Sequence, residues 1–362
     1  MKRVAIDVRM IGASGIGVYI QNILPFIVRE LPQYEFILLG KKEELSDLLE
    51  LENTRVVECS SGIYSLSEQW EIRKKLPKDI DLFWAPHYNV PLLYRGKLLV
   101  TIHDVFHLAM PEFVKGIEKK IYAKFVFNHI KKKASAIMTV SEFTKNEIVK
   151  YIGIEKNIIN VIYNGVEESW FNNEETFLNE ESNKYLIYVG NVKPHKNLSR
   201  LLEAFNLLKD TIPHDLIIVG KQEGFITGDN NITQQAKKLE GRIKFTGAIS
   251  DQALKRYVKN AEALIFPSLY EGFGLPPLEA MASNTPVIAS NIIPVREVCQ
   301  DAAIYFDPLN VEEMAEKILT VVTNESLARE LIIKGNYRAQ YFNWKNSAQK
   351  VVEVIEEVLS KK

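Results

Sequence analysis

The sequence predicts an α/β protein built from two doubly wound domains of similar size. Short apolar runs alternate with segments of helical spacing, and this alternation breaks once, in a polar and acidic stretch from about residue 167 to residue 184, before it resumes. Strands that are apolar on both faces and separated by helices form parallel sheets with helices on both sides. A length of 362 residues also favours two or three domains over one.

The first half is predicted to contain seven strands and four helices. Short runs rich in valine, leucine and isoleucine are typical of buried parallel strands. Longer segments with apolar residues every three or four positions indicate helices. The strands are 4–8, 35–39, 55–58, 82–85, 98–102, 136–140 and 158–162, and the helices are 16–29, 67–75, 117–133 and 143–151.

The second half repeats the pattern with further strands and helices, and one more amphipathic helix, 347–359, follows an aromatic cluster at 341–344. We expect an N-terminal domain of residues 1–170, a linker of 171–184 and a C-terminal domain of 185–344. The strands are 186–189, 216–219, 243–246, 264–266, 286–289 and 303–306, and the helices are 197–209, 251–260, 277–283, 311–323 and 326–336.

The composition excludes several classes of protein. A formal net charge of −1 argues against a nucleic-acid binder, since such domains usually carry a clear basic excess. Cys59 and Cys299 form no Cys-x-x-Cys pattern, so neither a disulfide scaffold nor a cysteine zinc site is expected. The sequence predicts no targeting segment and no apolar run of about 20 residues that would span a bilayer, so we expect a cytoplasmic protein.

A glycine-rich turn, residues 12–17, follows the first predicted strand and opens the first helix. Glycines there let the backbone approach a ligand closely, and a helix N-terminus favours an anion. The spacing of Gly12, Gly15 and Gly17 is not that of a dinucleotide fingerprint. A tight turn that needs glycine for steric reasons alone explains the pattern equally well, so both interpretations stay open.

The segment 190–197 is the loop after the first predicted strand of the second domain, and it contains Lys193 and Lys196. Two lysines beside a helix start would neutralise a diphosphate. A solvated loop with scattered charge is the alternative, and on this segment alone it is the better explanation.

The most informative segment is 271–279, which follows the predicted strand 264–266 and leads into a helix. Backbone amides of residues 273–275 near that helix start would form an anion cradle. Because carboxylates repel phosphate, Glu271 and Glu279 are better explained as acceptors of hydrogen bonds from sugar hydroxyls. The alternatives are a helix-dipole role for Glu279 and a solvated loop acid at Glu271, but the combination of glycines, prolines and paired acids favours ligand binding.

His103 and Asp104 follow the very apolar predicted strand 98–102. Ligands of α/β domains bind at the carboxyl ends of strands, although a lone histidine is more often structural. His87 and His107 have less support. No His, Asp or Glu cluster has metal-ligand spacing, so no metal site is expected.

Residues 115–133 carry seven lysines and one glutamate, a segment charge of +6. A basic amphipathic helix of this kind can lie on an anionic membrane surface. A helix packed on a sheet with its lysines in solvent has the same pattern, and we favour packing for the apolar stripe, with membrane contact as the alternative. The stripe consists of Ile117, Ile121, Tyr122, Phe125 and Ile130.

The segment 267–282, with two glutamates separated by seven residues, resembles the signature of retaining GT-B glycosyltransferases of family 4. The resemblance covers nearly the whole chain and is closest to bacterial mannosyl- and rhamnosyltransferases that build O-antigen or other surface polysaccharides. Further segments that resemble the family are 15–17, 103–104, 164–166, 190–197 and 245–247.

The resemblance implies two Rossmann-like domains that face a central cleft, with a C-terminal helix, 345–362, crossing back to complete the first. The second domain would bind the nucleotide sugar and the first the acceptor. His103 would lie near the reacting sugar, Glu271 would face the donor sugar, and Lys196 would neutralise the diphosphate. The implied substrate-binding residues are Gly15, Gly17, Asp104, Gly190, Asn191, Gly247, Phe273, Gly274, Leu275 and Glu279.

Two details of the implied donor site concern the nucleotide. Glu279 would accept hydrogen bonds from the ribose hydroxyls, and residues 246–249 would line the nucleobase. Many family members carry an arginine where this chain has Asn191. Lys193 would substitute for it only as a point charge, since a lysine lacks the bidentate fork of arginine.

The implied function is retaining transfer of a hexose, with mannose the first choice, to a saccharide or lipid-linked acceptor in surface polysaccharide synthesis. GDP-mannose is expected as donor, ahead of dTDP-rhamnose and UDP-sugars. No cofactor or metal is expected, because a lysine and preorganised amides can stabilise the leaving diphosphate. The alternatives are a sugar-nucleotide epimerase and a catalytically idle subunit that binds nucleotide sugar.

Overall fold

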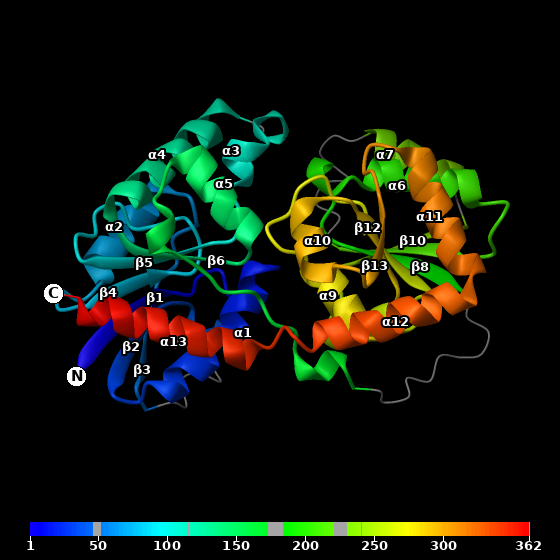
Figure 1. Ribbon diagram of the computed structural model, residues 1–362. Helices are drawn as coiled ribbons and strands as arrows, with labels where there is room; N and C mark the ends of the chain where they lie inside the picture. Colours follow the sequence, from blue (N-terminus) through cyan, green and yellow to red (C-terminus); the bar gives the residue numbers. More distant parts are fainter. Residues whose placement is uncertain (46–51, 115, 173–183, 221–229, 240, 362) are drawn as a thin grey trace. The chain divides into compact units, whose positions relative to one another are not determined.

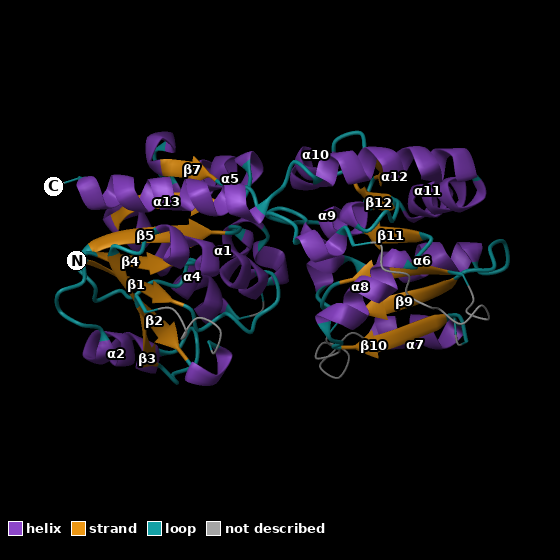
Figure 2. Cartoon of the chain, turned by 90° about the horizontal axis from the view of Figure 1, so that it is seen from below, coloured by secondary structure: helices purple, strands orange, loops and turns teal. Residues whose placement is uncertain are grey.

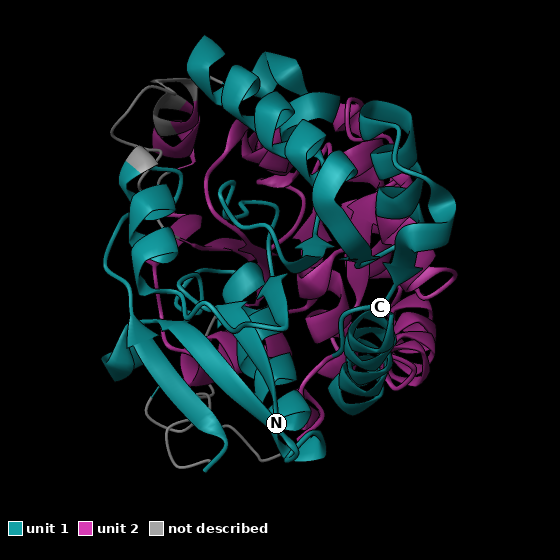
Figure 3. Ribbon diagram, turned by 90° about the vertical axis from the view of Figure 1, so that its left-hand side faces the viewer, with its two compact units in different colours: residues 1–165, 343–362 teal, residues 166–342 magenta. Residues whose placement is uncertain are grey.

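The computed structural model describes the chain apart from residues 46–51, 115, 173–183, 221–229, 240 and 362 (Figure 1). It contains two compact units, one made of Met1–Gly165 together with Asn343–Lys362 and the other of Val166–Phe342 (Figure 3). The sequence-based boundaries, 170 and 344, fall a few residues later. Most of the predicted linker, residues 173–183, lies outside the described residues.

The first unit is built on a parallel sheet of seven strands in the order β3-β2-β1-β4-β5-β6-β7. The register aligns Val4 of β1 with Phe36 of β2 and with Leu82 of β4. The first strand therefore lies inside the sheet, and the strand order reverses there. The strands are β1 (Lys2–Asp7), β2 (Tyr34–Gly40), β3 (Thr54–Glu58), β4 (Leu82–Ala85), β5 (Lys97–Ile102), β6 (Ala134–Thr139) and β7 (Ile159–Val161).

Helices cover both faces of this sheet (Figure 2). Successive strand residues point to opposite faces, and Phe83 of β4 joins a core cluster with Val126 of α4. Its neighbour Trp84 contacts Tyr19 of α1 on the other face. The helices are α1 (Ile16–Glu30), α2 (Leu66–Lys75), α3 (Phe106–Ala109), α4 (Ile117–Lys133), α5 (Glu142–Ile152) and α13 (Trp344–Ser360).

The last helix, α13, is an integral part of the first unit. It packs on α1, and Lys2 and Lys97 donate hydrogen bonds of 3.0 Å to carbonyl oxygens of its last turn. Those carbonyls have no partner within a helix. Its start lies so close to Gly165 that a Cβ there would be 2.3 Å from the Trp344 nitrogen. Any larger residue at position 165 would displace the helix.

The second unit contains a parallel sheet of six strands in the order β10-β9-β8-β11-β12-β13. The order again reverses at the first strand, because β8 lies between β9 and β11. The strands are β8 (Tyr185–Val189), β9 (Asp215–Val219), β10 (Ile243–Gly247), β11 (Ala263–Phe266), β12 (Val287–Ser290) and β13 (Ala303–Phe306).

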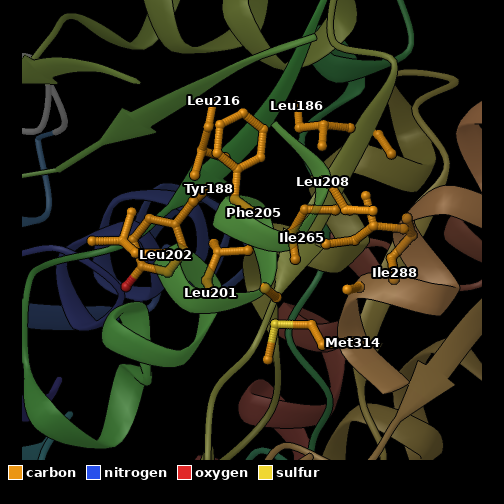
Figure 4. Close-up of a cluster of buried hydrophobic side chains, with 14 of the residues drawn as sticks. Leu186, Tyr188, Leu201, Leu202, Phe205, Leu208, Leu216, Ile265, Ile288 and Met314 are labelled. Atoms are coloured by element: carbon orange, nitrogen blue, oxygen red, sulfur yellow. The ribbon is translucent and has the colours of Figure 1, made fainter. Parts of the chain in front are cut away.

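One core cluster of the second unit lies between this sheet and helices on one of its faces. Tyr188 of β8 and Ile265 of β11 pack with Phe205 of α6 and Met314 of α11 (Figure 4). The helices of the unit are α6 (Leu198–Leu208), α7 (Asn230–Lys238), α8 (Asp251–Lys259), α9 (Leu275–Ala282), α10 (Ile293–Cys299), α11 (Val311–Thr323) and α12 (Glu325–Ala339).

The predicted fold class, two doubly wound α/β domains, is confirmed. Each predicted strand is present in one of the two parallel sheets, with ends shifted by at most two residues. Three observed α-helices were not predicted, namely α3, α7 and α10. The first has only four residues, the second is almost entirely polar, and the third begins with a proline in its second position.

The predicted packing of α4 is partly wrong. Ile130 is buried as expected, but Ile117, Ile121 and Phe125 are exposed by 72%, 63% and 58%. The helix instead packs through a different side, which follows the spacing of three and four residues of a buried helical face. That side consists of Ala123, Val126, Phe127 and Ile130. Lys115 lies outside the described residues.

No helix in the described ranges combines the length and the apolar character that crossing a membrane requires.

Candidate functional site

Lys196 and Glu271 lie where the strand order of the second unit reverses. Lys196 is in the loop after β8, Glu271 is in the loop after β11, and these strands are neighbours. Ligands of open α/β sheets bind beyond the carboxyl ends of the strands at such a point. The two side chains are brought together, with Nζ of Lys196 donating to Oε1 of Glu271 at 2.6 Å. Both are mostly shielded from solvent.

A buried asparagine ties the loops of this site together. Asn197 has a φ of 59°, and its Nδ2 donates to the carbonyl oxygens of Pro267 at 3.0 Å and Pro308 at 2.8 Å. The amide of Leu269 donates to the carbonyl of His195 at 2.8 Å. The loop after β8 is thus joined to those after β11 and β13. Backbone contacts therefore position Lys196 and Glu271.

Three glycines at the ends of neighbouring strands bring their backbones close together beside this pair. A Cβ on Gly220 would lie 2.1 Å from the carbonyl oxygen of Gly190, and the Gly220 amide donates to the carbonyl of Gly247 at 3.2 Å. Gly190 and Gly247, both predicted to bind substrate, are therefore joined through Gly220, which was not singled out from the sequence. Its position in the sequence could have indicated this role, because Gly220 directly follows β9 just as Gly190 directly follows β8.

Helix α9 begins at the predicted anion cradle. Gly274 is its N-cap with a φ of 120°, and no side chain caps the helix. Leu275 is the first helical residue, so this end carries the positive end of the helix dipole. The side chain of Phe273 is buried and its ring lies 5.6 Å from that of Phe342. Phe273 can therefore contribute to a ligand site through its backbone only.

Glu279 of α9 lies near a separate pair of charged side chains. Its neighbours include Glu167 and Lys255, which form an ion pair at 2.9 Å. Removal from water raises the pKa of Glu279 to about 8, and the charge of Glu167 adds to this rise while Lys255 opposes it. At neutral pH the carboxyl group of Glu279 is therefore protonated in most molecules. Neither Glu167 nor Lys255 was singled out from the sequence.

In the first unit, the glycine-rich turn leads into α1. Gly17 has no room for a side chain, because a Cβ would lie 2.5 Å from the carbonyl oxygen of Ile11. Gly15 is the N-cap, with a φ of 57° and open space around its Cβ position. The steric interpretation thus accounts for Gly17, whereas at Gly15 the backbone at the helix N-terminus is open to a ligand.

His103 follows β5, and one tautomer of its imidazole is favoured. Nε2 lies 2.8 Å from the carbonyl oxygen of Pro86, and because a carbonyl only accepts, Nε2 must carry the proton. Burial lowers the pKa of His103 to about 4. The ring is therefore neutral at neutral pH, and Nδ1 keeps a lone pair. This side chain is suited to accept a hydrogen bond from a hydroxyl.

Aromatic rings in edge-to-face contact support His103. The ring of Tyr19 lies 4.9 Å from that of His103 and 6.1 Å from that of Trp344. The Tyr19 hydroxyl and Nε1 of Trp84 both reach the hydroxyl of Thr101, at 3.4 and 3.0 Å. The first residue of α13 thus supports, through Tyr19, a residue predicted to be catalytic.

A buried ionic network, missed in the sequence, lies at the strand-order reversal of the first unit. Arg9 donates to both carboxylate oxygens of Asp7, at 2.8 and 2.6 Å, and to Glu68 at 3.0 Å. Asn89 also donates to Glu68, at 2.7 Å. Although burial opposes it, the hydrogen bonds from Arg9, together with the nearby His87 ring at 3.5 Å, hold the pKa of Asp7 well below its usual range. The network fixes the loop after β4, which includes the Pro86 carbonyl.

The other predicted residues have local backbone contacts. Oδ1 of Asp104 accepts from the amide of Phe106 at 2.9 Å, at the start of α3. The carbonyl of Asn191 accepts from the Tyr188 hydroxyl at 3.4 Å, and Lys193 is exposed. Among the residues that the structure describes, no group of three or more His, Cys, Asp and Glu side chains is arranged to hold a metal.

Two family models match the sequence and together span most of it. Residues 13–170 match "Glycosyltransferase Family 4" and residues 171–338 match "Glycosyl transferases group 1". The O-antigen chain mannosyltransferase RfbU of Salmonella typhimurium is 31% identical over 260 residues, 72% of this chain and 69% of that protein. The O-antigen chain mannosyltransferase B of Escherichia coli is 25% identical over 314 residues, 82% of this chain and 79% of that one.

Solved structures share the fold. HepE of Anabaena, in complex with UDP and glucose, has a TM-score of 0.77 at 18% identity and covers 99% of this chain and 100% of its own. WaaG, a glycosyltransferase involved in lipopolysaccharide biosynthesis, has a TM-score of 0.74 at 14% identity and covers 97% and 99%. The fold is that of the GT-B glycosyltransferases, as predicted. The chain belongs to glycosyltransferase family 4, which also confirms the predicted enzyme class, a hexosyltransferase.

Proposed function

We propose that this enzyme transfers mannose from GDP-mannose to a saccharide or lipid-linked acceptor of a surface polysaccharide, with retention at the anomeric carbon. The observation that carries the proposal is the Lys196–Glu271 pair at 2.6 Å. The pair lies at the strand-order reversal, with Lys196 in the loop after β8 and Glu271 in the loop that leads into α9. The choice of mannose is supported by the names of relatives, two of which are O-antigen mannosyltransferases.

The pair explains how the donor would be activated. As the bond between the anomeric carbon and the diphosphate breaks, negative charge grows on the leaving oxygen. Lys196 and the first amides of α9 would stabilise that charge without a metal or cofactor. When the diphosphate engages Lys196, Glu271 is released to accept hydrogen bonds from hydroxyls of the donor sugar.

Retention follows if the acceptor attacks from the face that the diphosphate leaves. The acceptor oxygen then bonds to the anomeric carbon, and its proton passes to an oxygen of the departing phosphate. His103 would accept a hydrogen bond from a sugar hydroxyl through Nδ1, because its Nε2 is held by Pro86. Glu279 would accept from the ribose hydroxyls, and the backbone around Gly247 would line the base.

Removing either member of the pair tests the mechanism. Lys196→Ala and Glu271→Ala are each expected to lower kcat by about a hundredfold or more, the usual effect of losing one preorganised electrostatic group. The matched control is Lys244→Ala, since Lys244 is an exposed lysine of the same unit. Initial rates with GDP-mannose, with circular dichroism to check folding, provide the measurement. Near-normal turnover in either variant contradicts the assigned role.

Donor choice is tested separately. A thermal-shift panel of GDP, UDP, dTDP and ADP is expected to give the largest stabilisation with GDP, because a ligand that binds only the folded state raises Tm. Nucleotide release is then measured with and without acceptor. Conversion of the sugar nucleotide without any acceptor product would indicate an epimerase. Binding without release would indicate an idle subunit.

We also propose that the enzyme works in the cytoplasm, with peripheral contact to the inner face of the membrane.

A further inference from the structure

Helix α4 exposes a row of large apolar side chains. Ile117, Ile121 and Phe125 are exposed by 72%, 63% and 58%. Their spacing of four residues aligns them on one side of the helix. This row, the α4 ridge, faces away from the buried side that packs on the sheet. Scattered exposed apolar residues are normal, but an aligned row of three large ones calls for a partner.

Lysines flank the α4 ridge. Lys124 follows Ile117 by seven residues and Lys132 follows Phe125 by seven, which is about two turns along the same side. Both lysines are exposed. Residues 117–133 contain six lysines and one glutamate, a net charge of 6 − 1 = +5.

The charge on α4 is not neutralised by the described part of the protein. The lysine ion pairs there involve lysines outside α4. The pKa of His129 is lowered by burial and by the positive charges of Lys133 and Lys132. The surface around the α4 ridge is therefore positive, and a partner must combine apolar groups with negative charge.

We propose that the α4 ridge and its lysines dock the enzyme on a bilayer that contains anionic phospholipid. Apolar side chains enter the boundary between headgroups and acyl chains, and lysines meet the lipid phosphates. Both features are required together. This inference rests on the peripheral membrane contact of the proposed function and names the surface that makes it. It does not depend on which donor sugar or acceptor the enzyme uses.

The inner side of α4 connects this surface to the loops of the sheet. The Tyr122 hydroxyl donates to the side chain of Asn89, and the Phe127 ring stacks on that of Tyr88 at 4.9 Å. Tyr88 and Asn89 belong to the loop after β4, beside His87 and the ionic network. An enzyme docked through α4 therefore holds the carboxyl edge of this sheet at a fixed position near the membrane.

Helix α12 provides a natural comparison. Ile333 and Tyr337 of this helix, and Tyr341 two residues after its end, are exposed by 71%, 81% and 64% and are also four residues apart. The lysine beside them is neutralised, since Lys334 pairs with Glu330 at 2.8 Å and with Asp301 at 3.2 Å. Arg338 also lies beside this row, with its guanidinium 5.1 Å from the centre of the Tyr341 ring. Residues 325–339 carry three basic and two acidic side chains, a net charge of 3 − 2 = +1 against +5 for α4. This second apolar row therefore has much less positive charge around it and serves as a control.

Vesicle co-sedimentation of the full-length enzyme without sugar nucleotide tests the proposal. Vesicles of phosphatidylcholine with phosphatidylglycerol are compared with phosphatidylcholine alone, and binding is expected only to the anionic vesicles and to weaken with salt. Ile117→Ser with Phe125→Ser should lower the partition coefficient at least about tenfold. Lys124→Glu with Lys132→Glu should lower it at least about thirtyfold.

Matched controls accompany each variant. Ile333→Ser with Tyr337→Ser removes two exposed apolar groups from α12, and Lys345→Glu with Lys350→Glu reverses two exposed lysines of α13. Both are expected to bind vesicles as the unchanged enzyme does. All variants alter exposed side chains, and turnover of a water-soluble acceptor is expected to stay unchanged, which separates docking from catalysis.

Several results would overturn the proposal. These are equal binding to both kinds of vesicle, no binding to anionic vesicles at low salt, and equal losses in the α4 and control variants. A concentration-dependent dimer that the α4 substitutions abolish, with no change in vesicle binding, would instead make the ridge an interface between copies of this chain.

Discussion

Among single residues, Glu279 makes the clearest prediction about stability. Its pKa is raised from 4.5 to about 8 in the folded protein. Between these pH values the folded state binds more protons than the unfolded state, so stability falls as the pH rises through this range. Glu279→Gln lacks this dependence. We expect Tm to fall more steeply with pH in the unchanged enzyme than in the variant, as measured by scanning fluorimetry. Parallel curves would contradict this.

The same residue predicts how nucleotide binding depends on pH. Ribose hydroxyls donate hydrogen bonds to the ionised carboxylate, so binding favours the charged form of Glu279. Affinity for GDP should therefore rise as the pH approaches about 8, and Glu279→Gln should bind more weakly with little pH dependence. Calorimetry at several pH values provides the measurement. Unchanged affinity in the variant would remove the ribose contact.

Site residues can be recognised from the sequence when they lie close together in one segment of the chain. Glu271 and Glu279 are recognisable because a single stretch carries both, together with its glycines and prolines. The contact between Arg9 and Glu68 joins residues 59 positions apart, and no spacing rule connects them. The pKa of Glu279 is raised mainly by burial, and Glu167, which adds to the rise, comes from elsewhere in the chain.

At the scale of elements, the glycines of the turn before α1 can be tested for a steric role as opposed to a role in ligand binding. Gly17→Ala places a Cβ 2.5 Å from a backbone carbonyl oxygen, and we expect it to cost about 1–3 kcal/mol of unfolding free energy. Gly12→Ala is the matched control, because its nearest neighbour would be 3.8 Å away. Denaturant titration compares the two. Equal stability of both variants would show that the turn tolerates a side chain.

The strands were easier to predict than the helix faces. Buried parallel strands are apolar throughout, so their residues mark them whatever they pack against. Helix α4 has apolar side chains on two sides, and periodicity alone does not determine which side meets the sheet. Phe127 and Ile130 pack inward, while Ile121 and Phe125, which are of the same kinds and sizes, are exposed.

For the whole molecule, α13 makes the first unit depend on a distant part of the chain. Trp344 is 4% exposed and contacts Tyr19, which supports His103. Trp344→Ala is expected to cost about 3–5 kcal/mol and to lower kcat. Trp70→Ala is the matched control, since Trp70 is 67% exposed. Thermal unfolding and initial rates are measured for both. A stable but slow Trp344 variant would separate support of His103 from general stability.

The two-domain architecture was predictable because it leaves a repeated signal, two series of strands and helices separated by one polar stretch. That α13 would belong to the first unit was implied by family resemblance and not by its sequence pattern. An amphipathic helix indicates only that one face is covered. The close approach of Gly165 to Trp344, 344 − 165 = 179 positions away, depends on backbone geometry that a sequence does not display.

The first unit consists of two segments of the chain, and these segments are synthesised at different times. During translation Met1–Gly165 leaves the ribosome first, yet the segment Asn343–Lys362 that completes this unit leaves after the whole of Val166–Phe342. Domains generally fold as units while the chain grows. The second unit can therefore finish folding before α13 is available to cover the apolar face of α1. A nascent chain of this enzyme is expected to need protection by chaperones at its N-terminal half.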